Sequence, residues 1–236
     1  MSGIFDFHSH VLPRVDDGSD SLETSLSLLK QEGEQGIRHV VATPHFYPNF
    51  DSPEHFLQRR NAAEERLREE LEKQADMPAL TVGAEVYFFS GISDSDILPE
   101  LTIGKKHCIL IEMPQPPWTE SMYRELEEIY KKQGITPIIA HVDRYIGPFH
   151  TFGIPKRLAR LPVLVQANAE FFLDRATARM AMRMLREDQI HLLGSDCHDL
   201  KHRKPNLGEA LERIRSRLGE DALNRIESYQ QHVLQD

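Results

Sequence analysis

Short apolar runs alternate with longer amphipathic segments along this chain, and that alternation restricts the possible folds more than any other feature. The apolar runs are rich in Val, Ile and Leu and nearly continuous, as in parallel strands that are buried on both faces. Strands that alternate with helices form βαβ units, which build a parallel sheet. We therefore expect an α/β fold. Seven strands fit a distorted seven-stranded (β/α) barrel that is TIM-barrel-like, and an open doubly wound sheet is the alternative.

The expected elements can be placed by residue range. The strands are Ile4–His8, His39–His45, Leu80–Phe88, Cys108–Met113, Thr136–His141, Val163–Asn168 and Ile190–Asp196. The helices are Leu22–Gln35, Pro53–Ala75, Glu120–Gln133, Pro155–Ala159, Arg175–Asp188, Asn206–Leu218 and about Asp221–Leu234. Gly36 and Gly134 stand where glycine commonly ends a helix. Asp20 with Glu23 resembles a capping box. A length of 236 residues fits one domain over residues 1–236.

Composition excludes several classes of protein. The net charge of -9 and the lack of a basic run argue against a nucleic-acid partner. We find no apolar stretch long enough for membrane insertion and no pattern of a signal peptide near the N-terminus. The two cysteines, Cys108 and Cys197, do not suggest a disulfide framework. We therefore expect a cytoplasmic protein with both thiols reduced.

Histidine and acidic residues stand at the ends of the expected strands. His8 and His10 are two residues apart, so they point to the same face where the first strand ends. Asp196 and His198 repeat this spacing at the seventh strand. In parallel α/β folds, ligands gather at the carboxyl ends of the strands. Six of the seven expected strands carry a His, Asp or Glu in their carboxyl-terminal half, and chance is a poor explanation for six together.

These strand ends and one loop supply nine candidate metal ligands. The loop contains Asp16 and Asp17, which could instead cap and charge the next helix; if one of them reaches the metals, Asp17 is favoured. Five imidazoles and four carboxylates are too many for one ion and suit two or three divalent ions. Nitrogen and oxygen ligands without thiolate favour Mn, Fe, Zn or Co. The candidates are His8, His10, Asp17, His45, Glu85, Glu112, His141, Asp196 and His198.

The order of these motifs resembles that of the PHP (polymerase and histidinol phosphatase) superfamily. More closely, the chain resembles the bacterial PHP-type protein-tyrosine phosphatases associated with capsule and exopolysaccharide synthesis, over almost its whole length. The matching motifs are His8-Ser9-His10, Asp16-Asp17-Gly18, Thr43-Pro44-His45, Gly83-Ala84-Glu85, Ile111-Glu112, Ala140-His141 with Arg144-Tyr145, and Ser195-Asp196 with His198.

This resemblance implies a barrel of PHP type, a three-metal site often supplied with manganese, and hydrolysis of phosphotyrosine on proteins. The usual partner in that family is a tyrosine kinase of polysaccharide export. The resemblance also implies that Arg144 and Arg203 bind phosphate, whose oxygens match a guanidinium fork. Each arginine could instead pair with a nearby acid, such as Asp143 or Asp199. Glu85 would bridge ions that activate a water for attack on phosphorus.

A second phosphatase mechanism has a similar sequence pattern. Cys197 and Arg203 form the C-x5-R skeleton of cysteine-dependent tyrosine phosphatases. That chemistry needs a loop of phosphate-binding amides and a thiolate of low pKa, whereas the intervening residues contain no glycine and include Asp199. Alternation along a strand also points Cys197 away from its neighbours Asp196 and His198. We therefore expect Cys197 to be dispensable.

Two further alternatives stay open. One is another PHP phosphoesterase, such as a histidinol-phosphate phosphatase; the other is a non-catalytic metal-binding regulatory module. A phenol, with a pKa of about 10, leaves with less protonation than an alkoxide, which mildly favours aryl esters. His202 and Tyr145 are possible proton donors, and neither is assigned that role.

Overall fold

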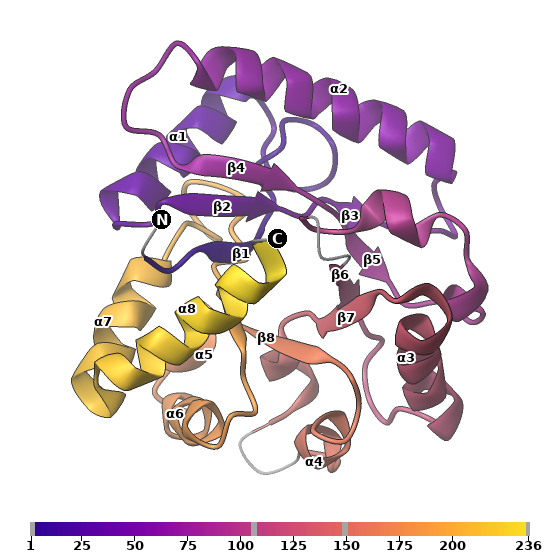
Figure 1. Cartoon of the computed structure of the whole chain (residues 1–236). Coiled ribbons are helices and arrows are strands. Elements are labelled where there is room, and N and C mark those ends of the chain that lie inside the picture. The colour runs from indigo at the N-terminus through magenta and orange to yellow at the C-terminus, as the bar shows by residue number, and fades with distance from the viewer. Residues whose placement is uncertain (1–2, 105–107, 148–150, 235–236) are drawn as a thin grey trace.

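The computed structural model describes residues 3–104, 108–147 and 151–234 (Figure 1). Within these residues the strands are β1 (Asp6–Ser9), β2 (His39–Ala42), β3 (His45–Phe46), β4 (Ala79–Val82), β5 (Glu85–Tyr87), β6 (Cys108–Glu112), β7 (Thr136–Ile139), β8 (Leu164–Asn168) and β9 (Leu192–Gly194). The α-helices are α1 (Leu22–Glu34), α2 (Pro53–Leu71), α3 (Glu120–Gln133), α4 (Ile154–Leu158), α5 (Ala169–Leu173), α6 (Ala178–Arg186), α7 (Leu207–Leu218) and α8 (Glu220–Leu234). Three short 3₁₀ helices cover Ile92–Asp94, Leu98–Leu101 and Val142–Tyr145.

The strands pair in parallel within two sheets. One sheet has the order β1-β2-β4, and the other has the order β3-β5-β6-β7-β8-β9 and curls into a half-barrel (Figure 1). The Asp196 N–H donates to the His8 carbonyl (2.7 Å), and the His10 N–H donates to the Cys197 carbonyl (2.9 Å). The end of β1 therefore lies beside the residues that follow β9.

The expectation of an α/β fold on parallel strands is confirmed, but a single seven-stranded barrel is wrong. The expected strand His39–His45 divides into β2 and β3 at Pro44, which has no N–H to donate to a ladder. The expected strand Leu80–Phe88 divides into β4 and β5 at Gly83-Ala84. The described residues therefore form nine strands in two sheets, of which the larger has six. This sheet curls, unlike the open doubly wound alternative.

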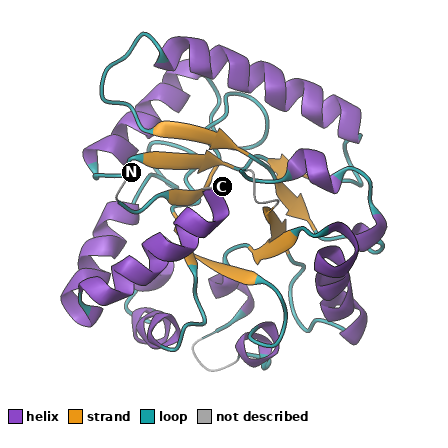
Figure 2. Cartoon of the chain, in the orientation of Figure 1, coloured by secondary structure: helices purple, strands orange, loops and turns teal. Residues whose placement is uncertain are grey.

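Two apolar clusters lie on the two faces of the strands and explain the continuous apolar runs. Along β6, Ile109 and Ile111 belong to one cluster, while Cys108 and Leu110 belong to the other. Helices lie around the strands (Figure 2). On α8, Gln230 binds the N–H and the carbonyl of Phe5 at 3.0 and 2.9 Å, next to the start of β1. The helix α8 therefore covers the end of the sheet where the strands begin.

Local signals set most helix boundaries. The α1 helix is capped by Ser21, whose hydroxyl accepts the Thr24 N–H at 3.1 Å, so the expected capping box on Asp20 is wrong. Gly134 ends α3 with a left-handed φ of 67°, as expected. The expected helices Pro53–Ala75 and Arg175–Asp188 are shorter in the structure, and α5 was not expected.

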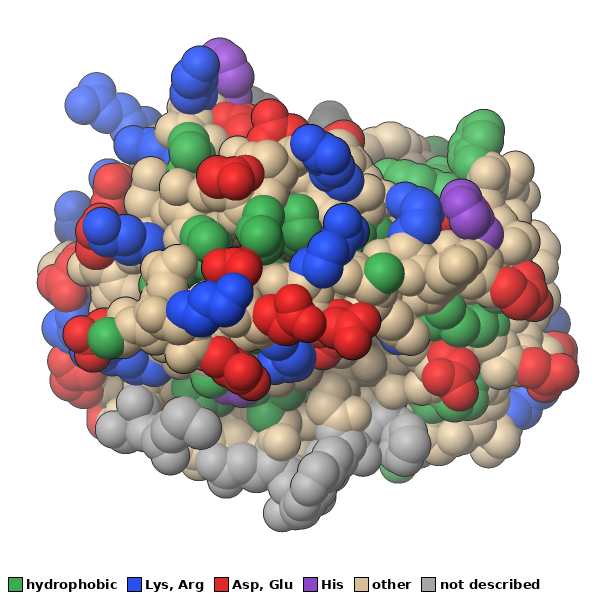
Figure 3. Space-filling model, turned by 90° about the horizontal axis from the view of Figure 1, so that it is seen from above, with side chains coloured by type: hydrophobic (Ala, Val, Ile, Leu, Met, Phe, Trp, Pro, Cys, Tyr) green, Lys and Arg blue, Asp and Glu red, His purple; other side chains and the backbone are tan. Residues whose placement is uncertain are grey.

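The helix α2 carries dense charge of both signs. Red and blue side chains are interspersed on the face of the molecule over this helix (Figure 3). Arg68 pairs with Glu64 one turn earlier at 2.7 Å, so this is a solvated surface with i,i+4 pairs. No helix in the described ranges has the length and apolar character to cross a bilayer.

Candidate functional site

The carboxyl ends of the strands bring the candidate ligands together, and two glycines permit the close packing. A Cβ on Gly194, the last residue of β9, would lie 2.5 Å from the Cβ of His8. A Cβ on Gly18 would lie 2.4 Å from the Cβ of His10. Real Cβ atoms do not approach so closely, so only glycine lets β9 and the Gly18 loop pack against these histidines.

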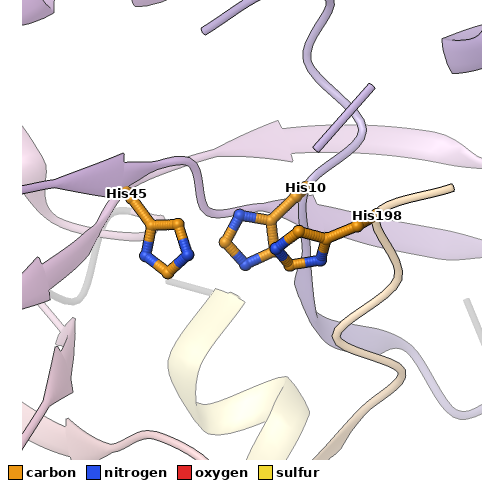
Figure 4. A group of neighbouring side chains, drawn as sticks. All are labelled: His10, His45 and His198. Carbon is orange, nitrogen blue, oxygen red and sulfur yellow. The ribbon is translucent and has the colours of Figure 1, made fainter. Parts of the chain in front are cut away.

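Three histidines from distant segments converge in the cluster (Figure 4). His10 follows β1, His45 begins β3, and His198 lies in the loop after β9. The ring of His10 lies 3.8 Å from that of His198 and 4.4 Å from that of His45, between centroids. Each offers one ring nitrogen, and these three nitrogens lie within 4.8 Å of one another.

Glu85 lies at the centre of the cluster and is 1% exposed. Its Oε2 is 3.1 Å from His8 Nε2 and 3.0 Å from His45 Nδ1. Its Oε1 is 2.8 Å from His141 Nε2. The two carboxylate oxygens thus face different imidazoles, an arrangement that suits a carboxylate shared between two ions.

Asp16 and Asp17 have different places in the cluster. Asp16 accepts from His10 Nδ1 at 2.7 Å and from the His45 N–H at 2.9 Å, so it orients His10 and fixes the start of β3. Asp17 is mostly exposed, and its Oδ1 lies 3.6 Å from both His45 Nε2 and His198 Nε2. This geometry favours Asp17 as the ligand. It gives Asp16 a positioning role that the sequence did not reveal.

Asp196 joins the histidines to the two arginines. Its Oδ1 lies 3.5 Å from His8 Nε2 and accepts from Arg203 Nη2 at 2.7 Å, while its Oδ2 pairs with Arg144 Nη2. The backbone of Asp196 has a φ of 54°, a left-handed conformation that is uncommon outside glycine. The expectation that strand alternation places Asp196 and His198 on one face is therefore wrong, because β9 ends at Gly194.

Glu112 and His141 complete the group beside Glu85. Glu112 ends β6, and its Oε1 lies 3.7 Å from His141 Nε2. The Tyr47 hydroxyl donates to Glu112 Oε2 at 3.4 Å. All nine candidate ligands thus lie in one connected cluster. Tyr47 was not a sequence candidate, since nothing marked a residue just beyond the strand end.

Amide side chains on β8 hold several of these groups in place. Gln166 Oε1 accepts from the His141 N–H at 2.6 Å and lies 3.2 Å from His8 Nδ1. Asn168 Nδ2 donates to Asp196 Oδ2 at 2.9 Å. Their spacing of two residues puts Gln166 and Asn168 on one face of β8. In the structure they position ligand candidates on three other strands or strand ends.

Burial and charge shift the pKa values within the cluster. Burial alone would raise the pKa of Glu85, but His8 and hydrogen bonds from His10 and His141 hold it well below the usual range. Burial and the nearby His10 lower the pKa of His198 to about 4, so this imidazole is neutral at pH 7. Glu85 as a carboxylate and His198 as a neutral imidazole are thus each in the form that binds a metal ion.

The residues present fit divalent metal ions. His45 Nδ1 and His198 Nε2 are buried and make no hydrogen bond, although His45 Nδ1 lies close to Glu85. Unpaired buried nitrogen atoms are costly unless another partner satisfies them. His10 and His8 each use Nδ1 toward a protein oxygen, which directs Nε2 to the cluster, as metal-binding imidazoles usually do.

Cys197 lies outside this cluster. Its side chain is fully buried, and burial with the nearby Glu32 and Asp6 holds the pKa of the thiol well above its usual range. The cysteine mechanism therefore lacks both an accessible sulfur and a thiolate. The hydroxyl of Tyr145 is also buried, and it accepts the Met113 N–H at 2.8 Å in the core.

A pocket of about 500 Å³ opens beside the cluster. Asp17 and His45 line it on the side of the cluster, and Tyr47 and Phe50 add aromatic rings. Phe50 is 90% exposed, although it is a large apolar residue. The pocket offers an aromatic surface next to the candidate ligands.

The model of the family described as "Capsular polysaccharide synthesis, CpsB/CapC" matches residues 4–234. The chain belongs to the CpsB/CapC family. This CpsB/CapC protein is 28% identical over 233 residues to the tyrosine-protein phosphatase CpsB of Streptococcus agalactiae serotype V, covering 94% of each chain.

Two solved structures share the fold of this CpsB/CapC protein. A structure from a study of YwqE from Bacillus subtilis and CpsB from Streptococcus pneumoniae, named as unique metal-dependent tyrosine phosphatases, matches with a TM-score of 0.79 and 21% identity, covering 97% of this chain and 93% of that one. Histidinol phosphate phosphatase from Lactococcus lactis matches with a TM-score of 0.55 and 16% identity, covering 93% and 92%. The shared fold therefore does not show whether phosphotyrosine or histidinol phosphate is the substrate.

Proposed function

We propose that this CpsB/CapC protein is a metal-dependent phosphatase that removes phosphate from tyrosine residues of proteins. The observation that carries the proposal is the junction at Asp196, where Arg144 and Arg203 meet the histidine cluster. The names of the curated relatives support the same activity. We further propose a tyrosine kinase of capsule or exopolysaccharide synthesis as the substrate, and the cytoplasm as the place of action.

The proposed metal ligands are the nine residues of the cluster. When bound, two or three divalent ions, with Mn as the proposed metal, would supply Lewis-acid activation of water and of the phosphoryl group. Glu85 is the proposed bridging ligand, because its two oxygens face His8 and His45 on one side and His141 on the other. Asp16 and Gln166 hold imidazoles of His10 and His8 in the orientation that turns Nε2 toward Glu85.

Arg144 and Arg203 are the proposed phosphate-binding and catalytic residues. Their side chains are 36% and 37% exposed, so each guanidinium has N–H groups beyond those used on Asp196. A fork of two N–H groups matches two oxygens of a phosphoryl group and stabilises charge that develops there. Because Asp196 binds both guanidinium groups, it holds Arg144 and Arg203 at the edge of the cluster of candidate metal ligands.

The pocket lined by Tyr47 and Phe50 suits an aromatic leaving group. Aromatic rings pack against one another with offset or edge-on geometry. The phenolate of a tyrosine side chain leaves with little help from an acid, because its conjugate acid has a pKa of about 10. This fits a site in which the Tyr145 hydroxyl is buried and accepts the Met113 N–H in the core.

The test is release of phosphate from a phosphotyrosyl peptide by the purified chain. Activity should disappear after chelation and return with Mn, Fe, Zn or Co added separately, which also identifies the preferred ion. Histidinol phosphate and a phosphoseryl peptide are measured in parallel. Faster turnover of histidinol phosphate would instead assign the protein to the other phosphoesterase class. No turnover of any phosphoester by metal-loaded protein would make it a regulatory module.

A further inference from the structure

A groove rich in arginine lies between α6 and α7, which pack side by side (Figure 1). Its volume is about 1080 Å³, and none of the candidate metal ligands lines it. Among the residues described by the structure, no aspartate or glutamate lines it. Its six arginines are Arg175, Arg179, Arg183, Arg186, Arg213 and Arg217.

Spacing places these side chains on facing surfaces. On α6, Arg179, Arg183 and Arg186 follow one another at intervals of four and three residues, so they share one side of the helix. Like charges at these intervals destabilise a helix. Arg213 on α7 is satisfied by the carbonyls of Phe172 and Leu173 at 2.9 and 2.6 Å. The other five arginines are exposed, and none forms an ion pair with any residue that the structure describes.

Other exposed arginines of this chain do find acidic partners. Arg215, on the same α7 helix, pairs with Glu212 and with Glu220 (2.6 Å). Arg157 is bound by the carboxylate of Glu120. Within the described ranges, unpaired exposed arginines also occur elsewhere, as at Arg38 and Arg160, so the groove is distinguished by five of them lining one cavity, on a chain whose net charge is -9. Neither helix stability nor general solubility explains why positively charged side chains are concentrated in this groove.

The remaining lining residues are apolar and flexible. Met180, Met182 and Leu218 lie among the arginines, with Ala176 and Ala178. Methionine adapts to apolar side chains of different shapes, and a guanidinium fork binds a carboxylate through two hydrogen bonds. We infer that the groove binds an acidic segment of a partner protein in which apolar residues stand among the acids.

Two other polyanions fit the groove less well. Proteins that bind single-stranded nucleic acid stack the bases on aromatic side chains, and none of the described residues that line the groove is Phe, Tyr or Trp. A membrane surface is flat, and proteins that lie on it present an apolar face that inserts between headgroups. A concave groove instead suits an extended segment of chain.

The test is fluorescence anisotropy of the full chain with a short labelled peptide of glutamate, leucine and alanine. Binding should weaken as salt is raised, since exposed charges are screened. R179E/R183E should raise the Kd for the peptide at least about tenfold, because each substitution removes a charge-assisted hydrogen-bonded pair between the groove and the peptide. R38E/R160E changes the net charge equally at exposed positions outside the groove and should bind like the wild type. R175E/R217E gives a second, independent removal of charge from the groove.

Four results would overturn the inference. The first is that both groove variants bind the peptide like the wild type, and the second is that R38E/R160E loses as much binding as they do. The third is that a peptide with glutamine in place of glutamate binds equally well. The fourth is that an oligothymidylate or phosphatidylglycerol vesicles bind the wild type more tightly than the peptide does. Hydrolysis of a small aryl phosphate should be the same in wild type and groove variants. Since that readout does not involve the groove, failure of the proposed phosphatase activity is distinguishable from failure of this inference.

Discussion

Glu32 on α1 offers a prediction about the support beneath the site. Its carboxyl is fully buried, and neither of its oxygens has a hydrogen-bond partner. One oxygen of Glu32, one of Asp6 and the Cys197 Sγ lie within 4.8 Å of one another. Burial and the Asp6 carboxyl raise the pKa of Glu32 well above its usual value. Replacing Glu32 by methionine removes this carboxyl and keeps an unbranched side chain of similar length.

The expected gain follows from the cost of the buried group. An unpartnered buried polar group costs about 1–3 kcal/mol, and a side chain of similar volume leaves little cavity. E32M should therefore raise the free energy of unfolding by about 1–3 kcal/mol, or the Tm by roughly 2–10 °C for a chain of this size. Asp6 still accepts the N–H groups of His8 (3.0 Å) and Ser195 (2.9 Å), so no new unpaired group appears.

The gain should grow as the pH rises. With a raised native pKa, folded Glu32 keeps a proton that the unfolded chain releases above a pKa of about 4.3. The stability of the wild type therefore falls between these two pKa values, by at most about 1.4 kcal/mol per pH unit for one proton. E32M lacks this contribution. The difference between the two proteins should be smallest near the unfolded-state pKa and largest at neutral pH or above.

Scanning calorimetry of wild type, E32M and E34M over roughly pH 5–8 checks this reasoning. Glu34 is exposed on the same helix, so E34M should stay within about 0.5 kcal/mol of the wild type. The reasoning fails if E32M melts below the wild type, or if its gain does not depend on pH. A loss of stability confined to metal-loaded protein would mean that Asp6, Glu32 and Cys197 bind a cation.

Three further substitutions test the candidate site. R144M should lower kcat/KM for a phosphotyrosyl peptide by about 10²–10³-fold, measured in steady-state kinetics, because one phosphate-binding donor is lost; a change under twofold would contradict its role. C197S should keep most of the activity, since the thiol is buried away from the cluster; an inactive but folded variant would revive the cysteine mechanism. G18A should lower stability by about 1–3 kcal/mol in thermal melts, because its Cβ would collide with His10, whereas G33A, with no atom closer than 3.5 Å, should not.

The sequence predicted which segments are strands because burial on both faces leaves a signal within each run. Ile109 and Leu110 are both fully buried but belong to different clusters, so β6 reads as continuously apolar. The division of two expected strands was not predicted. Pro44 is visible in the sequence, but its effect depends on distant strands, since β2 pairs with β1 and β4 whereas β3 pairs with β5. Such pairing has no local signature.

The positions of His8 and His10 could be predicted, because both lie on one short segment whose strand spacing puts them on the same face. Side-chain positions that depend on contacts between distant segments were harder to predict. Asp143 and Asp199 were the local partners considered for the arginines, yet Asp143 accepts the Asn168 N–H (2.9 Å) and Asp199 accepts N–H groups of its own loop. Both arginines instead bind Asp196, which is 52 residues from Arg144. The link between the phosphate-binding groups and the metal cluster is therefore a product of the fold. It depends on the left-handed backbone at Asp196, which turns this carboxylate toward His8 and both guanidinium groups at once.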